Sequence, residues 1–138
     1  RGQPAAAEAA LRSALTLAPR SVPALDRLAQ VLVAEKRYSA AIGYLKEAAQ
    51  LDPKDPNLRI ELAAAYSANN EPDRAIETLT NLVKDEPGSA IAHFNLATAY
   101  AQQNNFRPSA DEYRETLRLD PHNDVARLSL VKTLVELA

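Results

Sequence analysis

The chain has 138 residues, of which 46% are hydrophobic and 25% are charged. This composition is that of a folded domain and not of a disordered or collagen-like chain. The 16 basic and 18 acidic residues nearly cancel, leaving a formal net charge of -2, so no long-range field favours nucleic acid or an anionic membrane as a partner. Cysteine is absent, which excludes disulfides and thiolate metal sites.

The sequence also argues against membrane insertion. No apolar run approaches the roughly 18 residues that span a bilayer, and the first twenty residues lack the pattern of a secretory signal. The cellular compartment stays open. The chain begins at Arg1 and contains no methionine, which predicts that it is a fragment of a longer protein.

Prolines recur every 34 residues, at Pro19, Pro53, Pro87 and Pro121. A fixed period of this length is typical of stacked helical repeats. In chain order, we expect a helix over residues 4–17, which is the second helix of a truncated unit. Three complete units follow, over residues 22–55, 56–89 and 90–123, and residues 124–137 form the first helix of a further unit or a cap.

Each complete unit is predicted to be a helical hairpin. Its first helix carries apolar or small residues at the seventh, eighth and eleventh places, and its second helix does so at the twentieth and twenty-fourth, so each set lies on one helical face. The first-helix residues are Leu28, Ala29 and Leu32, then Leu62, Ala63 and Tyr66, then Leu96, Ala97 and Tyr100. Polar turn residues separate the two helices, as in an αα-hairpin.

The helix starts are marked by residues that can cap them. Asp55, Ser89 and Asn123 are predicted N-caps of first helices, and Ser39 and Asp73 are predicted N-caps of second helices. Because the residue before a proline is steered away from the α region, each periodic proline ends the helix before it.

The third unit resembles the tetratricopeptide repeat (TPR) pattern, from Ala90 through His93-Phe94-Asn95-Leu96-Ala97 to Tyr100, Phe106, Tyr113, Leu117 and Asp120-Pro121. The resemblance extends over nearly the whole chain. It implies an all-α fold, a right-handed α-α superhelix or solenoid of helix-turn-helix TPR hairpins with about eight helices, in a single TPR domain over residues 1–138. The chain departs from the family at the fifteenth place, where the usual glycine is replaced by Lys36, Asn70 and Asn104.

The resemblance also implies a function, that of a noncatalytic protein-protein interaction scaffold. In this family the first helices line a concave groove that binds a peptide or partner protein. The residues expected to line it here are Asp26, Gln30, Asn57, Ile60, Ala64, Ile91, Phe94, Asn95, Thr98, Gln102, Val125, Leu128 and Lys132.

Apolar groove residues are expected to form one patch, made of Ile60, Ile91, Phe94, Val125 and Leu128. Such a patch suits an extended or helical peptide with apolar anchors. The alternative is that these side chains pack on one another or on further repeats, since apolar stripes are usually core. Both interpretations stay open at this point.

The acidic tails of chaperones are disfavoured as ligands. The family's two-carboxylate clamp needs basic or amide residues at places that hold Asp26, Gln30, Glu61, Ile91 and Asn95 here. An acidic tail would be repelled by the two carboxylates among these residues.

No enzyme motif is present. The only histidines, His93 and His122, lie 29 residues apart, and the three glycines are never clustered, so we expect no metal site, no phosphate-binding loop and no cofactor. Two other functions remain as alternatives. The chain could be the substrate-recruiting arm of a larger enzyme, or a homodimer could form through the C-terminal helix, which is apolar on several sides.

Overall fold

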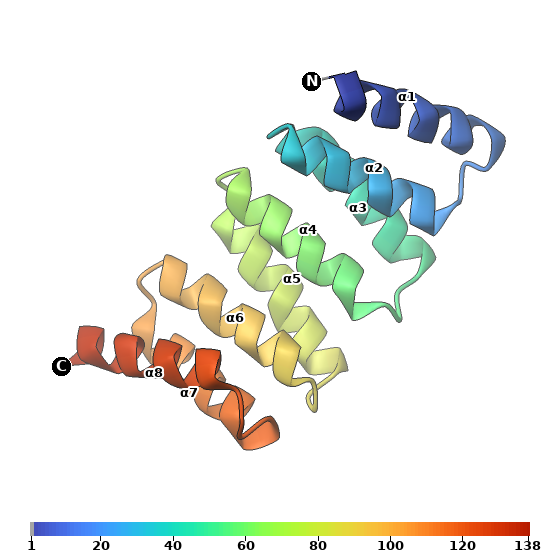
Figure 1. The fold of residues 1–138 in the computed structure, drawn as a ribbon. Coiled ribbons are helices and arrows are strands. Elements are labelled where there is room, and N and C mark those ends of the chain that lie inside the picture. The colour runs from blue at the N-terminus through green and yellow to red at the C-terminus, as the bar shows by residue number, and fades with distance from the viewer. Residues whose placement is uncertain (1) are drawn as a thin grey trace. The chain divides into compact units, whose positions relative to one another are not determined.

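The computed structural model describes residues 2–138, which form eight α-helices and no strand (Figure 1). These are α1 Gly2–Leu17, α2 Val22–Ala34, α3 Tyr38–Leu51, α4 Pro56–Ala68, α5 Pro72–Asp85, α6 Ala90–Gln102, α7 Phe106–Leu119 and α8 Asp124–Leu137. The all-α class and the number of helices predicted from the repeat are confirmed. None of the described helices is long and apolar enough to cross a membrane.

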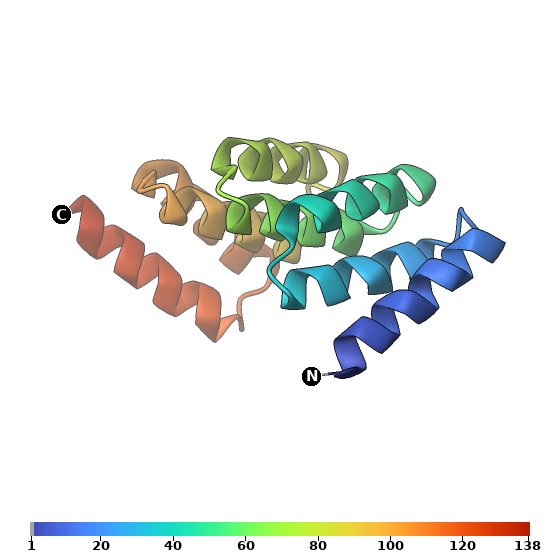
Figure 2. The same cartoon turned by 90° about the horizontal axis from the view of Figure 1, so that it is seen from above.

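The helices group into two compact units, one ending at Glu71 and the other beginning at Pro72. In the first unit α2 packs against α1 and α3, and α3 also packs against α4. Figure 2 shows α3 stacked above α2. In the second unit α6 packs against α5 and α7, and α7 also packs against α8. Each α2–α3 and α6–α7 pair is therefore a helical hairpin, as the repeat pattern predicts.

The core of each unit is built from the repeated apolar places. In the first unit Leu28, Ala29 and Leu32 of α2 are completely buried, together with Ala41 of α3. In the second unit Ala97, Tyr113 and Ala126 form a buried cluster that joins α6, α7 and α8. Small residues recur at these places because helix axes about 8 to 10 Å apart leave little room between backbones.

The N-caps of the first helices are as predicted. The side chain of Asp55 accepts a hydrogen bond from the backbone of Asn57 at 2.9 Å, and Ser89 and Asn123 cap α6 and α8 in the same manner. Ser21 caps α2, with its hydroxyl accepting from Ala24 at 3.4 Å. These caps satisfy N–H groups that have no partner inside the helix.

The predicted caps of the second helices are wrong. The helix α3 begins at Tyr38 with Arg37 at the N-cap position, so Ser39 is already the second helical residue. Asp73 likewise lies in the first turn of α5, which begins at Pro72. The rigid backbone of proline suits the first helical position. Both helices therefore start two residues earlier than the predicted caps indicate.

The turns inside the hairpins explain the three departures at the fifteenth place. Lys36, Asn70 and Asn104 have φ angles of 61°, 63° and 59°, in the left-handed region. The next residue completes the turn, since the N–H of Arg37 donates to the carbonyl of Leu32 at 2.8 Å. This is the Schellman arrangement, in which glycine and asparagine are the least strained residues.

Candidate functional site

The residues predicted to line a groove are divided between the two units. Asp26, Gln30, Asn57, Ile60 and Ala64 belong to the first unit, and the other eight belong to the second unit. The predicted patch that joins Ile60 to the apolar residues of α6 and α8 stays a prediction. Each unit has a pocket of its own.

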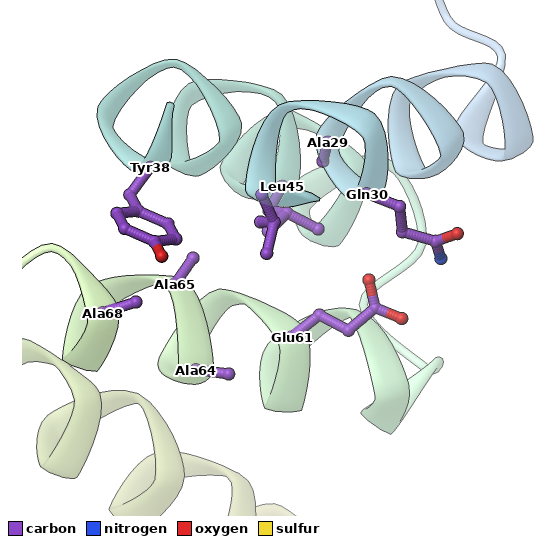
Figure 3. Close-up of a pocket in the computed structure, with 9 residues that line it drawn as sticks. Ala29, Gln30, Tyr38, Leu45, Glu61, Ala64, Ala65 and Ala68 are labelled. Atoms are coloured by element: carbon purple, nitrogen blue, oxygen red, sulfur yellow. The ribbon is translucent and has the colours of Figure 1, made fainter. Parts of the chain in front are cut away.

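The pocket of the first unit lies between α2, α3 and α4 and has a volume of about 450 Å³. Its wall is mostly apolar, with a carboxylate and an amide at one end and an aromatic ring at the other (Figure 3). The lining residues are Ala29, Gln30, Val33, Tyr38, Leu45, Glu61, Ala64, Ala65 and Ala68. The alanines leave the pocket open because their side chains are short.

The polar end of this pocket is a hydrogen-bonded group of three side chains from two helices. Gln30 Nε2 donates to Asp26 Oδ2 at 3.2 Å, and Gln30 also hydrogen-bonds Glu61 of α4. Figure 3 shows Gln30 and Glu61 pointing toward each other. The Oδ1 atom of Asp26 is buried and accepts no hydrogen bond from the described residues.

The neighbouring carboxyl group of Asp26 affects the protonation of Glu61. Burial, followed by the hydrogen bond and the charge of Asp26, raises the pKa of Glu61 from its ordinary value of 4.5 to about 7, while the hydrogen bond from Gln30 acts in the opposite direction. A proton on Glu61 lets the two carboxyl groups share a hydrogen bond. When both are ionised, the negative charge of Glu61, which lines the pocket, lies beside that of Asp26, and neither carboxylate is paired with a cation of the described residues.

Arg27, a cation of the same helix as Gln30, bonds to the amide and not to a carboxylate. Arg27 Nη1 donates to the amide oxygen of Gln30 at 3.1 Å. This bond orients the amide so that its nitrogen faces Asp26 and Glu61. The pocket therefore has a polar end in which Gln30 is held by hydrogen bonds.

The pocket of the second unit lies between α6, the turn before α8, and α8, with a volume of about 470 Å³. It brings together three of the predicted groove residues, Ile91, Phe94 and Val125, beside Asp120 and Asn123 of the turn. Ile91 and Val125 are 53% and 63% exposed, and Leu128, one turn further along α8, is 57% exposed. These three are open apolar side chains.

Phe94 has a mixed role. Its ring lies 5.8 Å from that of Tyr113 in an edge-to-face arrangement, and it packs on the buried cluster of the second unit. It also lines the pocket with Ile91 and Val125. Phe94 is therefore partly a core residue, whereas the more exposed apolar side chains of this pocket are those of Ile91 and Val125.

Two predicted groove residues of α6 are engaged within the unit. Asn95 Nδ2 donates to the carbonyl of Ile91 at 2.8 Å. The hydroxyl of Thr98 donates to the carbonyl of Phe94 at 2.9 Å and lies 3.2 Å from the hydroxyl of Tyr113. These bonds hold both side chains against their own helix or its neighbour.

The remaining predicted residues lie at exposed or half-buried positions. Asn57 and Gln102 are exposed, and Ile60 is half-buried. Lys132 lines a small pocket of about 190 Å³ with Ser129 and Glu136 of α8 and with Ala101, Phe106, Tyr113 and Thr133.

Sequence reasoning missed that Asp26 and Glu61 form a pair. The sequence predicts Asp26 as a groove residue and uses both carboxylates to exclude an acidic ligand, but it does not place them together. Their separation is 35 residues, one repeat plus one position, and this spacing places the fifth residue of one first helix beside the sixth of the next. Tyr38 was also missed, because it lies in the hairpin turn by sequence but reaches the pocket.

Comparison with known proteins identifies the family. Three models described as tetratricopeptide repeat match residues 1–56, 32–92 and 90–123. No curated protein sequence matches the chain.

Solved structures with the same fold share little sequence with the chain. The MamA protein aligns at a TM-score of 0.82 with 21% identity, over 98% of this chain and 74% of MamA. YrrB, a TPR protein with an unusual peptide-binding site, aligns at 0.74 with 18% identity, over 97% of this chain and 69% of YrrB. The first TPR of Spaghetti (RPAP3), bound to an HSP90 peptide, aligns at 0.74 with 21% identity, over 84% of this chain and 92% of that one. The fold is thus an all-α TPR solenoid, and the chain belongs to the tetratricopeptide repeat family.

Proposed function

We propose that this chain is a noncatalytic interaction module in which the repeats over residues 22–123 and the helix α8 bind a peptide segment of a partner protein. TPR proteins are generally interaction modules, and two proteins with this fold are described with a bound peptide or a peptide-binding site. At this level of identity the likeness concerns the fold alone. The binding surface must therefore be argued from the side chains of this chain.

The observation that carries the proposal is the open apolar surface of α6 and α8. Ile91 and Val125 line a pocket of about 470 Å³ and are each more than half exposed, as is Leu128 one turn further along α8. Contiguous apolar surface of this kind is costly to leave in water and marks interaction sites in soluble proteins. We call these three residues the apolar anchor surface, and expect it to take apolar side chains of the partner.

Selection of peptides from a displayed random library tests this proposal, with selected peptides measured by fluorescence polarisation. Leu128→Asp should weaken binding by at least about tenfold, since anchor residues commonly carry about 1.4 kcal/mol or more. Ile91→Asp should act in the same direction. Arg107→Asp, at an exposed position of α7, is the matched control and should leave binding unchanged. Equal affinity of all three variants would remove the assignment.

Phe94 is unsuitable for this test because its ring contacts Tyr113 in the core. A charged residue there would destabilise the unit, so lost binding could reflect unfolding. Exposed Leu128 and Ile91 avoid this problem.

Self-association is a second candidate function, and a specific observation favours it. Val131 and Leu134 of α8 are 54% and 38% exposed, at the eighth and eleventh places of the repeat. The same places in α6 hold Ala97 and Tyr100, on a helix that packs against α7. Sedimentation velocity at increasing concentration tests this candidate. Concentration-dependent dimers that Val131→Asp abolishes would support it, and a monomer throughout would exclude it.

A further inference from the structure

The last helix, α8, carries an apolar face that matches the buried face of α2. The helix α2 packs against α3, and three of its apolar residues are completely buried, namely Leu28, Ala29 and Leu32. The residues three repeats later in α8 are Leu130, Val131 and Leu134. Val131 and Leu134 are 54% and 38% exposed. The helix α8 therefore presents to solvent part of a face that a second helix covers in α2.

The first helix, α1, presents the matching face of a second helix. One repeat before the buried Ala41, Leu45 and Ala48 of α3, the same three residue types stand in α1 as Ala7, Leu11 and Ala14. In α1 the side chain of Ala14 is exposed, and those of Ala7 and Leu11 are only half-buried. Figure 1 shows α1 at the outer edge of its unit, beside α2. This face of α1 is therefore open to solvent in the part of the chain that the structure describes.

The two open faces together reproduce a contact that the chain already makes. Of the six residues that face each other between α2 and α3, five recur unchanged in α8 and α1, and the sixth is Val131 in place of Ala29. The α2–α3 contact shows that such faces fit closely, because all six of its residues are at most 1% exposed. Small residues let the helix axes approach to about 8 to 10 Å, and removing the apolar side chains from water favours the contact. A contact of α8 with α1 would therefore continue the packing of the repeats.

We propose that α8 of one molecule packs on α1 of a second copy, so that the two helices complete one helical hairpin at the contact. This inference rests on self-association, the second candidate function above, and names the surface of the partner copy. Because the two sides of the contact differ, it is heterologous, and every added copy leaves one α8 and one α1 free. Assembly therefore continues beyond the dimer, whereas pairing of α8 with another α8 would stop there.

One charged residue of α8 stands at a place that is apolar in α2. Arg127 occupies the place of Leu25, which clusters with Ala48 of α3. The guanidinium of Arg127 is already bonded within its own molecule, to the carboxylate of Asp124 and, through Nη2 at 2.6 Å, to the carbonyl of Pro121. The contact with a second copy therefore does not have to bury an unpaired charge.

Complementation between two blocked variants tests this contact. Ala14→Asp places a charge on the open face of α1, and Val131→Asp places one on the open face of α8. Each substitution should weaken the contact by at least about tenfold, because it would bury an unpaired carboxylate, so each variant alone should be monomeric by sedimentation velocity. An equimolar mixture should form a dimer that does not grow, since one intact α8 meets one intact α1. The parent chain should grow beyond the dimer as its concentration rises.

Matched substitutions separate this face from the rest of each helix. Ser13→Asp adds the same charge at a neighbouring exposed position of α1, at the place of the exposed Glu47 in α3, and should leave association unchanged. Val131→Ala restores the small residue of α2 and should associate at least as tightly as the parent chain. An unspecific apolar contact would instead weaken with the loss of two methyl groups. Circular dichroism checks that every variant keeps its helices.

Three outcomes would overturn the inference. They are a parent chain that stays monomeric at millimolar concentration, dimers of the Ala14→Asp variant alone, and an equimolar mixture of the blocked variants without a dimer. Dimers of Ala14→Asp alone would retain self-association through α8 and exclude the contact with α1. The peptide-binding function fails separately, because Ala14 lies outside the apolar anchor surface and Ala14→Asp should bind selected peptides as tightly as the parent chain.

Discussion

At the residue scale, the repeat shows where this chain tolerates strain. Lys36, Asn70 and Asn104 occupy the same left-handed turn position. Asparagine adopts this conformation with little cost because its short polar side chain bonds locally, whereas lysine meets the usual steric penalty of about 1 kcal/mol or more. The three turns are therefore alike in geometry but unequal in strain.

Replacing Lys36 with glycine should raise the free energy of unfolding by about 0.5 to 1 kcal/mol, because the clash of the β-carbon is removed. Urea unfolding followed by circular dichroism measures the change. Asn70→Gly is the matched control and should differ little from the parent chain. If Lys36→Gly were destabilising, the turn would be held by contacts of the lysine side chain and not by backbone conformation.

The acidic pair makes stability depend on pH. Burial and Asp26 raise the pKa of Glu61 to about 7 in the folded chain, above its ordinary value of 4.5. Between these pH values the unfolded chain releases the proton and the folded chain keeps it, so stability falls as the pH rises from about 4.5 to about 7. Below this window both states hold the proton, and above it the whole penalty is present.

Glu61→Gln should remove this dependence, because glutamine cannot ionise. We expect the variant to be more stable than the parent by about 1 kcal/mol at pH 8, after discounting for solvent screening, and similar to it at pH 4. Urea unfolding at both pH values checks this. Asp26→Asn should lower the titration midpoint of Glu61 in ¹³C NMR, and an unchanged midpoint would mean that Asp26 has no part in it.

At the element scale, the helix starts separate two kinds of N-terminus. The first helices begin with a polar side chain that accepts a backbone hydrogen bond, as at Asp55. The second helices begin directly after the hairpin turn, and neither Arg37 nor Asn105 makes a side-chain cap bond. The tight turn itself sets where these helices start.

Asp55→Ala should therefore lower the free energy of unfolding by about 1 kcal/mol, the usual loss for an N-cap. Ser39→Ala should have almost no effect, because Ser39 lies inside α3 and is exposed. Thermal and urea unfolding of the two variants give the comparison. A loss at Ser39 as large as that at Asp55 would contradict the observed start of α3.

A buried histidine makes one of the polar contacts that hold the hairpin of α6 and α7. His93 is 6% exposed, with Nδ1 at 2.5 Å from Glu112 Oε2 of α7 and Nε2 at 2.9 Å from the carbonyl of Pro87. Both ring nitrogens thus face acceptors on other elements.

Truncation of this contact should be costly. His93→Ala should lower the free energy of unfolding by about 2 kcal/mol, because it removes a buried ring together with its hydrogen bonds to Glu112 and to the carbonyl of Pro87. His122→Ala, at an exposed turn position, is the control and should change stability little. Equal effects of the two substitutions in urea unfolding would show that the network does not stabilise the hairpin.

At the scale of the whole molecule, the sequence predicted the architecture because the 34-residue period places similar residues at the same helical positions in each repeat. The places of Leu28, Leu62 and Leu96 are buried in all three units, and α8 has the predicted bounds of residues 124–137. Because the pattern recurs, a helix that is weakly indicated in one repeat is also indicated at the same place in the next repeat.

The candidate site was less predictable, since the repeat constrains the stack and leaves the surface free to vary. The exposure of Ile91 and Val125 followed from their places in the repeat. The packing of Phe94 on Tyr113 did not, because an aromatic ring at that place can turn to the core or to solvent. The pairing of Asp26 with Glu61 required the neighbouring helices to be placed side by side.

The central claim is that the first helices of the repeats bind a peptide. The most direct measurement is amide chemical-shift mapping of a selected peptide on the ¹⁵N-labelled chain. The account predicts that the largest shifts fall on α6 and α8, at Ile91, Val125 and Leu128. Shifts confined to the exposed faces of α3, α5 and α7 would contradict it.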